Sequence, residues 1–227
     1  MSISFAAIPA LEKIAAMTPE ERAEHDAWVD KENAKAADLQ KQSNYEKAAP
    51  RRYWQSSLDT YTVSNPEQRQ ALQAVRQFVG DIKGGQAANL ALIGRAGTGK
   101  THLACGALRE CGGRYYAASE LAERMHRAHG FSTHETEADI LKECTECTLL
   151  VIDEVGRGAS PDDEKYAIYK IINERYNERR GTLLVSNFKA AEFYKYIGAA
   201  VADRFNEGGA VFEFINTPSY RQRGGRI

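Results

Sequence analysis

Beyond residue 53, short apolar runs alternate with longer segments of helical pattern. Strands and helices that alternate along a chain are typical of a parallel sheet with helices on both faces. The pattern therefore predicts an α/β domain with a parallel five-stranded sheet. The expected strands are residues 89–93, 114–118, 149–153, 182–186 and 210–215, and the expected helices are residues 66–80, 100–110, 119–129, 135–144, 162–179 and 189–206.

The first 50 residues carry a different pattern. Thr18 and Pro19 form a helix start, because threonine caps the first turn and proline needs no amide partner there. The stretch to about residue 49 is rich in Ala, Glu, Lys and Gln, which favour helix. Its large apolar residues are too few to bury a core, so it is either a solvated helix or a helix that docks on a partner. We favour docking, because Trp28 would otherwise be an exposed aromatic residue. The sequence thus predicts a helical partner-binding arm at residues 1–50 and a main domain at 51–227.

Charge narrows the class of partner. The chain has 30 Lys and Arg against 31 Asp and Glu, so any DNA contact must come from a local basic patch. Residues 1–50 hold six basic and nine acidic side chains, a net charge of −3. Phosphate backbones repel such a surface, so the expected partner of the arm is a protein.

Composition bears on three other classes of protein. Apolar residues make up 43% of the chain, which is typical of a globular protein rather than a disordered one. No run of eighteen apolar residues occurs, so no membrane partner is expected. The four cysteines, without an export signal, are expected to be reduced thiols of a cytoplasmic protein. Cys144 and Cys147 have zinc-ligand spacing, but no second matching pair follows, so a helix end leading into a strand is the better interpretation.

The clearest chemical signal is GRAGTGKT at residues 94–101. It fits the phosphate-binding loop, and it lies between an apolar strand and a helix, as that loop requires. Glycines let backbone amides turn toward phosphate oxygens at the helix N-terminus. Lys100 would reach the β- and γ-phosphates of a nucleotide, and the Thr101 hydroxyl would bind Mg²⁺. The expected nucleotide-binding residues are Gly94, Arg95, Ala96, Gly97, Thr98, Gly99, Lys100, Thr101 and His102.

Two further strand ends are candidates for hydrolytic chemistry. The run LLVIDE at residues 149–154 is a buried strand from whose carboxyl end Asp153 emerges, at the sheet edge where ligands bind. Asp153 can hold Mg²⁺ through water, and Glu154 can polarise the attacking water. Asn187 follows the strand at 182–186. If that strand lies beside the Asp153 strand, the Asn187 amide could hold the water or the γ-phosphate; otherwise it is a turn residue.

Together these motifs resemble the AAA+ ATPases, and within them the DnaC-type replicative helicase loaders and the related IstB-type transposition helpers. The resemblance covers about residues 53–227. It implies a P-loop NTPase fold and an enzyme that hydrolyses ATP with Mg²⁺. The matching segments are GRAGTGKTHLA at 94–104, LLVIDEVG at 149–156, LLVSN at 183–187, ADRF at 202–205 and SYRQR at 219–223.

Two late arginines take their roles from this resemblance. Arg204 matches the arginine finger, which reaches the γ-phosphate in a neighbouring subunit, and Arg221 matches the second sensor arginine. Without the resemblance, Arg204 would be a surface arginine paired with Glu207. About a dozen residues follow the last expected strand, so no C-terminal helical lid over the adenine is expected. A neighbour must then complete the pocket, which predicts an open ring or spiral and slow hydrolysis that depends on assembly and DNA.

A possible DNA-binding region lies between the second and third strands. Residues 119–147 form an insertion of two helical patterns, and in the DnaC branch this region and the start of the next helix resemble the element that binds single-stranded DNA. Cations would contact phosphate and a ring would stack on a base. The alternative is a solvated helix pair with Phe131 in a local core. The candidate contacts are Arg124, Arg127, His129, Phe131 and Lys165.

The leading interpretation is an ATP-dependent loader that grips the replicative helicase through residues 1–50 and places it on single-stranded DNA. One alternative is an ATPase that assists a DNA transposase, which would have to grip duplex DNA against the acidic charge of the arm. A P-loop kinase for a small metabolite is a second, but the missing lid, the carboxylate pair and the late arginines count against it. Intact Lys100, Thr101, Asp153 and Glu154 count against a protein that only binds nucleotide.

Overall fold

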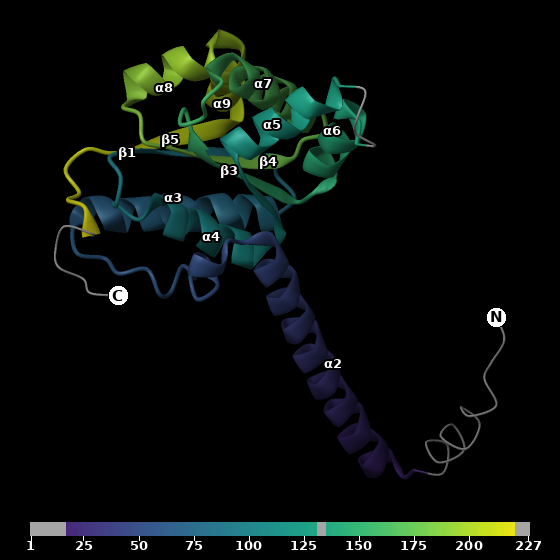
Figure 1. Ribbon diagram of the computed structural model, residues 1–227. Coiled ribbons are helices and arrows are strands. Elements are labelled where there is room, and N and C mark those ends of the chain that lie inside the picture. The colour runs from purple at the N-terminus through teal and green to yellow at the C-terminus, as the bar shows by residue number, and fades with distance from the viewer. Residues whose placement is uncertain (1–16, 131–134, 221–227) are drawn as a thin grey trace. The chain divides into compact units, whose positions relative to one another are not determined.

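The computed structural model describes residues 17–130 and 135–220 (Figure 1). The chain divides into two compact units between Ser43 and Asn44. This division comes before the boundary expected at residue 50. Tyr45 and Ala49, inside the expected arm, are buried in the core of the second unit. The Tyr45 hydroxyl also donates a hydrogen bond to the Tyr53 carbonyl oxygen at 2.6 Å.

The described part of the first unit is dominated by α2 (Pro19–Ala48), the end of which belongs to the second unit. The helix begins where the sequence predicts. The Thr18 amide donates to Glu21 Oε2 at 2.8 Å, and the Glu21 amide donates to Thr18 Oγ1 at 3.2 Å, a reciprocal cap. The apolar side chains of α2 are not gathered on one face, and Trp28 and Leu39 are 59% and 72% exposed.

The second unit is built on one five-stranded sheet in the order β2-β3-β4-β1-β5. All neighbouring strands are parallel, which confirms the predicted sheet. The central strands are almost wholly buried, as expected for strands covered on both faces, whereas β2 and β5 are partly exposed edges. The strands are β1 (Asn89–Gly94), β2 (Gly113–Ala117), β3 (Leu149–Val155), β4 (Gly181–Ser186) and β5 (Gly209–Phe214).

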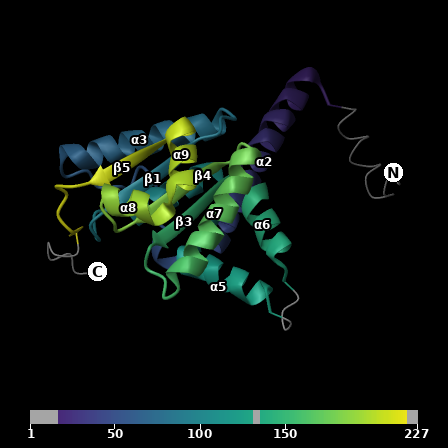
Figure 2. The ribbon, with the colours of Figure 1, turned by 90° about the horizontal axis from the view of Figure 1, so that it is seen from above.

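Helices form a layer on each face of the sheet (Figures 1 and 2). Alternate residues of β1 point to opposite layers: Leu90 and Leu92 belong to the core under α3 and α4, and Ala91 and Ile93 to the core under the other helices. The first layer holds α3 (Pro66–Lys83) and α4 (Lys100–Cys111), which follow a short 3₁₀ turn, η2 (Arg51–Tyr53). The second holds α5 (Ala118–Ala128), α6 (Glu137–Glu146), α7 (Pro161–Asn177), α8 (Ala190–Ile197) and α9 (Ala199–Gly208).

One expected helix is in fact two. The segment predicted as a helix at residues 189–206 is broken at Gly198, where φ is 79°. Because glycine adopts this backbone conformation readily and other residues do not, the break falls there and α9 takes a new direction. Residues 215–219 after β5 are bend and irregular chain, and Tyr220, the last described residue, has 3₁₀ conformation. Within the described ranges, no helix is both long and apolar enough to cross a bilayer.

A buried arginine joins α7 to the ends of α6 and of β3 and β4. Arg175 is 0% exposed, and its guanidinium donates to the carbonyl oxygens of Cys144 at 2.5 Å and Cys147 at 3.1 Å. It also donates to Thr182 Oγ1 at 3.0 Å. The segment around the two cysteines is therefore a helix end leading into β3, as the sequence predicts. The part of the chain covered by the structure holds no group of three or more His, Cys, Asp or Glu that could bind a metal.

We predict that Arg175→Met lowers the free energy of unfolding by about 3 kcal/mol, because methionine fills the space but leaves several buried carbonyl oxygens without a donor. The measurement is urea unfolding followed by circular dichroism. Arg180→Met is the matched control, since Arg180 is exposed and close in the chain. Equal stability of the two variants would show that water replaces the guanidinium.

Candidate nucleotide site

The loop between β1 and α4 is tightly packed. Gly97 and Gly99 have φ of 83° and 99°, and Gly99 precedes the first turn of α4. A Cβ atom on Gly99 would lie 2.6 Å from the Tyr61 ring, and one on Gly97 would collide with Ser219. Side chains are therefore excluded here for two reasons, the backbone conformation and the close approach of neighbours. The resulting curl leaves backbone amides at the start of a helix, where anions bind.

Lys100 is folded into this loop. Its side chain is almost fully buried, and Nζ donates to the carbonyl oxygens of Gly94 at 2.6 Å and Arg95 at 2.8 Å. A buried ammonium is stabilised more by a full negative charge than by carbonyl oxygens. Lys100 would therefore gain from a phosphate oxygen bound at this loop. Thr101 is the next residue on α4 and is half-buried. The donor set of amides, one cation and one hydroxyl fits a nucleotide phosphate with Mg²⁺.

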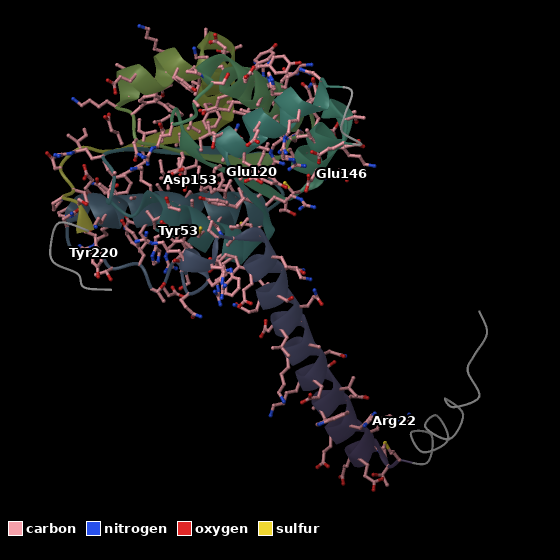
Figure 3. The ribbon with its side chains drawn as sticks, viewed as in Figure 1. Arg22, Tyr53, Glu120, Glu146, Asp153 and Tyr220 are labelled. Carbon is pink, nitrogen blue, oxygen red and sulfur yellow. The ribbon has the colours of Figure 1, made fainter. Side chains whose placement is uncertain are left out.

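Asp153 lies at the carboxyl end of β3 and is 3% exposed (Figure 3). Its Oδ2 accepts a hydrogen bond from the Tyr115 hydroxyl at 2.8 Å, and its Oδ1 accepts one from the Glu154 amide at 2.6 Å. Burial, together with the neighbouring carboxylate, raises the pKa of Tyr115, so this phenol stays a donor. Sequence reasoning missed Tyr115, which the parallel pairing of β2 with β3 brings to Asp153.

Glu154 adopts an uncommon backbone conformation for a residue with a side chain, with φ of 58°. Its carboxylate is exposed, with Oε1 3.3 Å from Arg157 Nη1. The Arg157 amide donates to the Glu154 carbonyl oxygen at 3.1 Å, so Glu154 begins a tight turn. Sparsely populated backbone conformations cluster at functional sites, so this conformation marks Glu154 as a candidate functional residue.

The end of β4 connects the loops after β1 and β3. β4 lies between these two strands, so Asn187 stands beside the Asp153 strand, as the sequence hypothesis required. The Ser186 hydroxyl donates to the Val155 carbonyl oxygen at 2.8 Å. The Gly94 amide donates to the Phe188 carbonyl oxygen at 2.9 Å. Asn187 itself is exposed at this edge.

The other residues predicted to bind nucleotide lie in different surroundings. Arg95 and Ala96 are exposed at the tip of the loop, and the Thr98 carbonyl oxygen accepts a hydrogen bond from the Tyr61 hydroxyl at 3.2 Å. The His102 side chain instead faces the segment before α3, with Nε2 3.0 Å from the Ser57 carbonyl oxygen. Burial lowers the pKa of His102. Any contact of His102 with nucleotide would therefore come from its backbone.

The chain after β5 returns to the loop, a feature that sequence reasoning missed. We call residues 215–220 the C-terminal strap. Glu67, in the first turn of α3, accepts hydrogen bonds from the Ile215 amide at 2.9 Å and from the Thr217 hydroxyl. Tyr220 lies beside the start of α3 (Figure 3), and its amide donates to the Gly97 carbonyl oxygen at 2.9 Å. Arg221, the predicted second sensor, follows directly in the chain but lies outside the described residues.

Arg204 lies on α9 and contacts α7. Nη1 donates to the Ala200 carbonyl oxygen at 2.8 Å, Nη2 donates to Asn173 Oδ1 at 2.5 Å, and the guanidinium lies 5.4 Å from the centre of the Tyr176 ring. Glu207, the partner expected without the family resemblance, accepts a hydrogen bond from the Tyr176 hydroxyl at 2.5 Å. Arg204 is thus held on a cradle of two α7 side chains, at a distance in the chain from the phosphate loop.

The candidate DNA contacts are mostly paired with carboxylates. Arg124 is largely buried and donates to Glu135 and Glu143, each at 2.6 Å, so it is a structural cation. His129 Nε2 lies 2.7 Å from Glu137 Oε2. The pairs of the other two cations are longer: Arg127 lies 3.9 Å from Glu123, and Lys165 lies 3.4 Å from Asp162. Phe131 lies outside the described residues.

These features define the class of protein. A parallel five-stranded sheet with a Gly-Lys-Thr loop after β1 and an Asp-Glu pair at the end of β3 is a P-loop NTPase of the AAA+ type. The solved structure of DnaI shares this fold, with a TM-score of 0.62 and 20% identity over 74% of this chain and 95% of that one. The expected fold class is confirmed.

The family follows from the sequence comparisons. The family model described as IstB-like ATP binding protein matches residues 7–225, and the chain belongs to this family. The chain is also similar to the replicative helicase loader DnaC of Escherichia coli strain K12, with 29% identity over 216 residues that cover 93% of this chain and 87% of that protein. DnaC of Buchnera aphidicola subsp. Acyrthosiphon pisum is 29% identical over 75% of this chain and 71% of its own. The crystal structure of the DnaC helicase loader matches with a TM-score of 0.64 and 26% identity, over 73% of this chain and 100% of that one.

We predict that Glu67→Ala weakens binding of Mg-ATP about five- to tenfold, because loss of these hydrogen bonds releases the strap from the phosphate loop. The measurement is titration calorimetry with a non-hydrolysable ATP analogue. Glu110→Ala, which removes an exposed glutamate paired with Lys83, is the control. If both variants bind as tightly as the wild type, the strap has no part in the site.

Proposed function

We propose that this protein is an ATP-dependent loader of the replicative helicase onto single-stranded DNA at the initiation of replication. The observation that carries the proposal is the similarity to DnaC loaders over nearly the whole chain, including residues outside the ATP-binding domain. A shared ATP-binding domain alone would fit many functions. Similarity that extends into the arm also includes the part with which a loader would grip its helicase.

The geometry of the site supports hydrolysis as well as binding. Bound ATP and Mg²⁺ would supply the phosphoanhydride bond to be cut and a cation that neutralises phosphate charge. Lys100 and the loop amides would hold the phosphates, and Thr101 and Asp153 would hold the metal. Glu154 would accept a proton from the attacking water, and Asn187, at the end of the adjacent strand, would hold that water in line. Arg221 would act as the second sensor, since its chain neighbour is bonded to Gly97.

Assembly is the second element of the proposal. The Arg204 cradle on α7 and α9 would suit an arginine finger that acts on the γ-phosphate of a neighbouring copy, since the Asn173 side chain holds the guanidinium against α7. A head-to-tail contact of this kind repeats into an open ring or spiral. Hydrolysis would then be slow in isolated subunits and would increase on assembly with DNA.

The proposed partners follow from charge and exposure. The arm, with its excess of acidic side chains and exposed Trp28 and Leu39, suits a protein surface on the helicase. Single-stranded DNA would bind along α5 and the start of α7, where the candidates Arg127 and Lys165 are exposed. A replicative helicase acts on the chromosome, so this role places the chain in the cytoplasm, where its four free thiols stay reduced.

A second candidate function is assistance to a DNA transposase, because the matching family model is described as IstB-like. This role requires a grip on duplex DNA. Binding to duplex in preference to single-stranded oligonucleotides of equal length would favour it over helicase loading.

We predict that deletion of residues 1–43 abolishes loading but leaves ATP binding intact, because Tyr45 and Ala49, which belong to the core of the ATP-binding unit, are retained. Lys100→Ala should bind the helicase yet fail at the nucleotide-dependent step. The measurement is assembly of a replicative helicase on circular single-stranded DNA, with the wild type as reference and Lys142→Ala as the control. Normal loading by the truncated chain would contradict the role of the arm.

We predict that Arg204→Ala loses at least about 100-fold in ATP hydrolysis, since a finger in trans is worth that much or more. Mixing it with an equal amount of Lys100→Ala should restore hydrolysis to about one quarter of the wild-type rate. In a random head-to-tail assembly, about one contact in four joins a subunit with an intact phosphate loop to a neighbour with an intact arginine finger. The assay is phosphate release at high protein concentration with a single-stranded oligonucleotide. Failure of the mixture to exceed either variant alone would argue against a finger in trans.

A further inference from the structure

A buried carboxylate that the nucleotide site does not itself use lies behind the loop after β3. Glu164, in the first turn of α7, is 0% exposed. Its Oε1 accepts a hydrogen bond from the Gly156 amide at 2.6 Å, and its Oε2 accepts one from the Gly158 amide at 3.0 Å. Burying a charge is costly unless hydrogen-bond donors surround it. The two amides of the loop therefore stabilise the carboxylate at this position.

The loop that Glu164 holds is the one that begins with Glu154. The Arg157 amide closes a turn onto the Glu154 carbonyl oxygen, and the Gly156 amide inside this turn points to Glu164. On the opposite side, the Ser186 hydroxyl donates to the Val155 carbonyl oxygen. Hydrogen bonds therefore hold the turn through its backbone amides and through its carbonyl oxygens. Glu154, with φ of 58°, is the first residue of this turn.

The same turn contacts the end of β4. Gly156 has φ of 88°, and a Cβ atom there would collide with the Phe188 ring. The Phe188 carbonyl oxygen in turn accepts a hydrogen bond from the Gly94 amide of the phosphate loop. Movement of Gly156 would therefore shift both the Glu154 side chain and the neighbourhood of Asn187, the two groups proposed to hold the attacking water.

We propose that Glu164 is a positioning residue for ATP hydrolysis: its carboxylate clamps the amides of Gly156 and Gly158 and thereby sets the direction of the Glu154 side chain. This inference rests on the proposed hydrolytic function. It assigns Glu164 no contact with nucleotide. Its effect is on the rate of the chemical step, since an error of about 1 Å in the position of a catalytic group can cost about 100-fold in rate.

The test is Glu164→Gln, which keeps the size of the side chain but turns one acceptor into a donor that faces an amide donor. We expect kcat for ATP hydrolysis to fall about 10- to 100-fold. We expect the Kd for Mg-ADP, measured by calorimetry, to change by less than about twofold, because the phosphate loop is unaltered. Hydrolysis is measured with the full chain at high protein concentration and a saturating single-stranded oligonucleotide.

The matched control is Asp163→Asn, which makes the same isosteric change and removes the same charge in the same turn of α7. Asp163 is half-exposed; it accepts a hydrogen bond from the Ser160 hydroxyl at 2.5 Å and lies 3.4 Å from His126 Nδ1. Its kcat should equal that of the wild type. An unchanged kcat for Glu164→Gln, or a loss of Mg-ADP affinity as large as the loss of kcat, would overturn the positioning role.

A second variant covers the case in which Glu164→Gln fails to fold. Gly158→Ala keeps the buried carboxylate but places a Cβ atom 2.5 Å from Glu164 Oε2, which must move. It should show the same selective fall in kcat, and an unchanged kcat would overturn the proposal. Glu154→Gln distinguishes failure of the positioning role from failure of the proposed function. If Glu154→Gln abolishes hydrolysis while Glu164→Gln and Gly158→Ala leave kcat unchanged, only the positioning role fails. If the wild type does not hydrolyse ATP at all, the proposed function fails with it.

Discussion

The site depends on how the backbone at the carboxyl ends of β1, β3 and β4 is held together. Three loops begin at one edge of the sheet, and each carries one part of the proposed chemistry. The Gly94 amide is bonded to the Phe188 carbonyl oxygen, the Phe188 ring packs against Gly156, and the Ser186 hydroxyl is bonded to the Val155 carbonyl oxygen. Because β4 stands between the other two strands, its last residue Ser186 and the nearby Phe188 supply all three contacts. The strand order thus brings the loop after β4 between the phosphate loop and the turn at residues 154–157.

This constraint explains why buried polar side chains surround the site. Tight loops leave amides and carbonyl oxygens that no regular element satisfies, and each must find a partner when buried. Glu164 accepts two such amides, Glu67 accepts the amides of the strap, and Lys100 donates to two carbonyl oxygens of its own loop. For Glu67, burial raises the pKa, but the hydrogen bonds from Thr217, Ile215 and Asn216 outweigh it and hold the pKa below its usual value. The carboxylate therefore remains an acceptor at neutral pH.

The sequence predicts the sheet, the phosphate loop and the Asp-Glu pair well, because each depends on local signals. Apolar runs, a glycine pattern and an acid at a strand end can all be read from neighbouring residues. Tyr115, Glu164 and Glu67 could not be found in this way. Tyr115 meets Asp153 only through strand pairing, and Glu67 meets residues about 150 positions away in the chain. Glu164 had a weak signal, an acid in the first turn of a helix, which usually reflects only the helix dipole. The division between Ser43 and Asn44 has no local signal either, since α2 continues across it without any change in helical pattern.

The arm and the Arg204 cradle both carry side chains whose contacts are incomplete among the described residues. Most large apolar and cationic side chains elsewhere are satisfied within the unit, whereas Trp28 and Leu39 are exposed on α2 and the Arg204 Nε atom is buried without a partner. An unsatisfied buried donor costs free energy, and a movement of the Arg204 side chain that brings this donor to a further acceptor would recover that cost. A phosphate oxygen of a neighbouring copy would be such an acceptor, and a helicase surface would cover the exposed residues of the arm. If the proposed assembly forms, binding at these two surfaces would link assembly to ATP turnover.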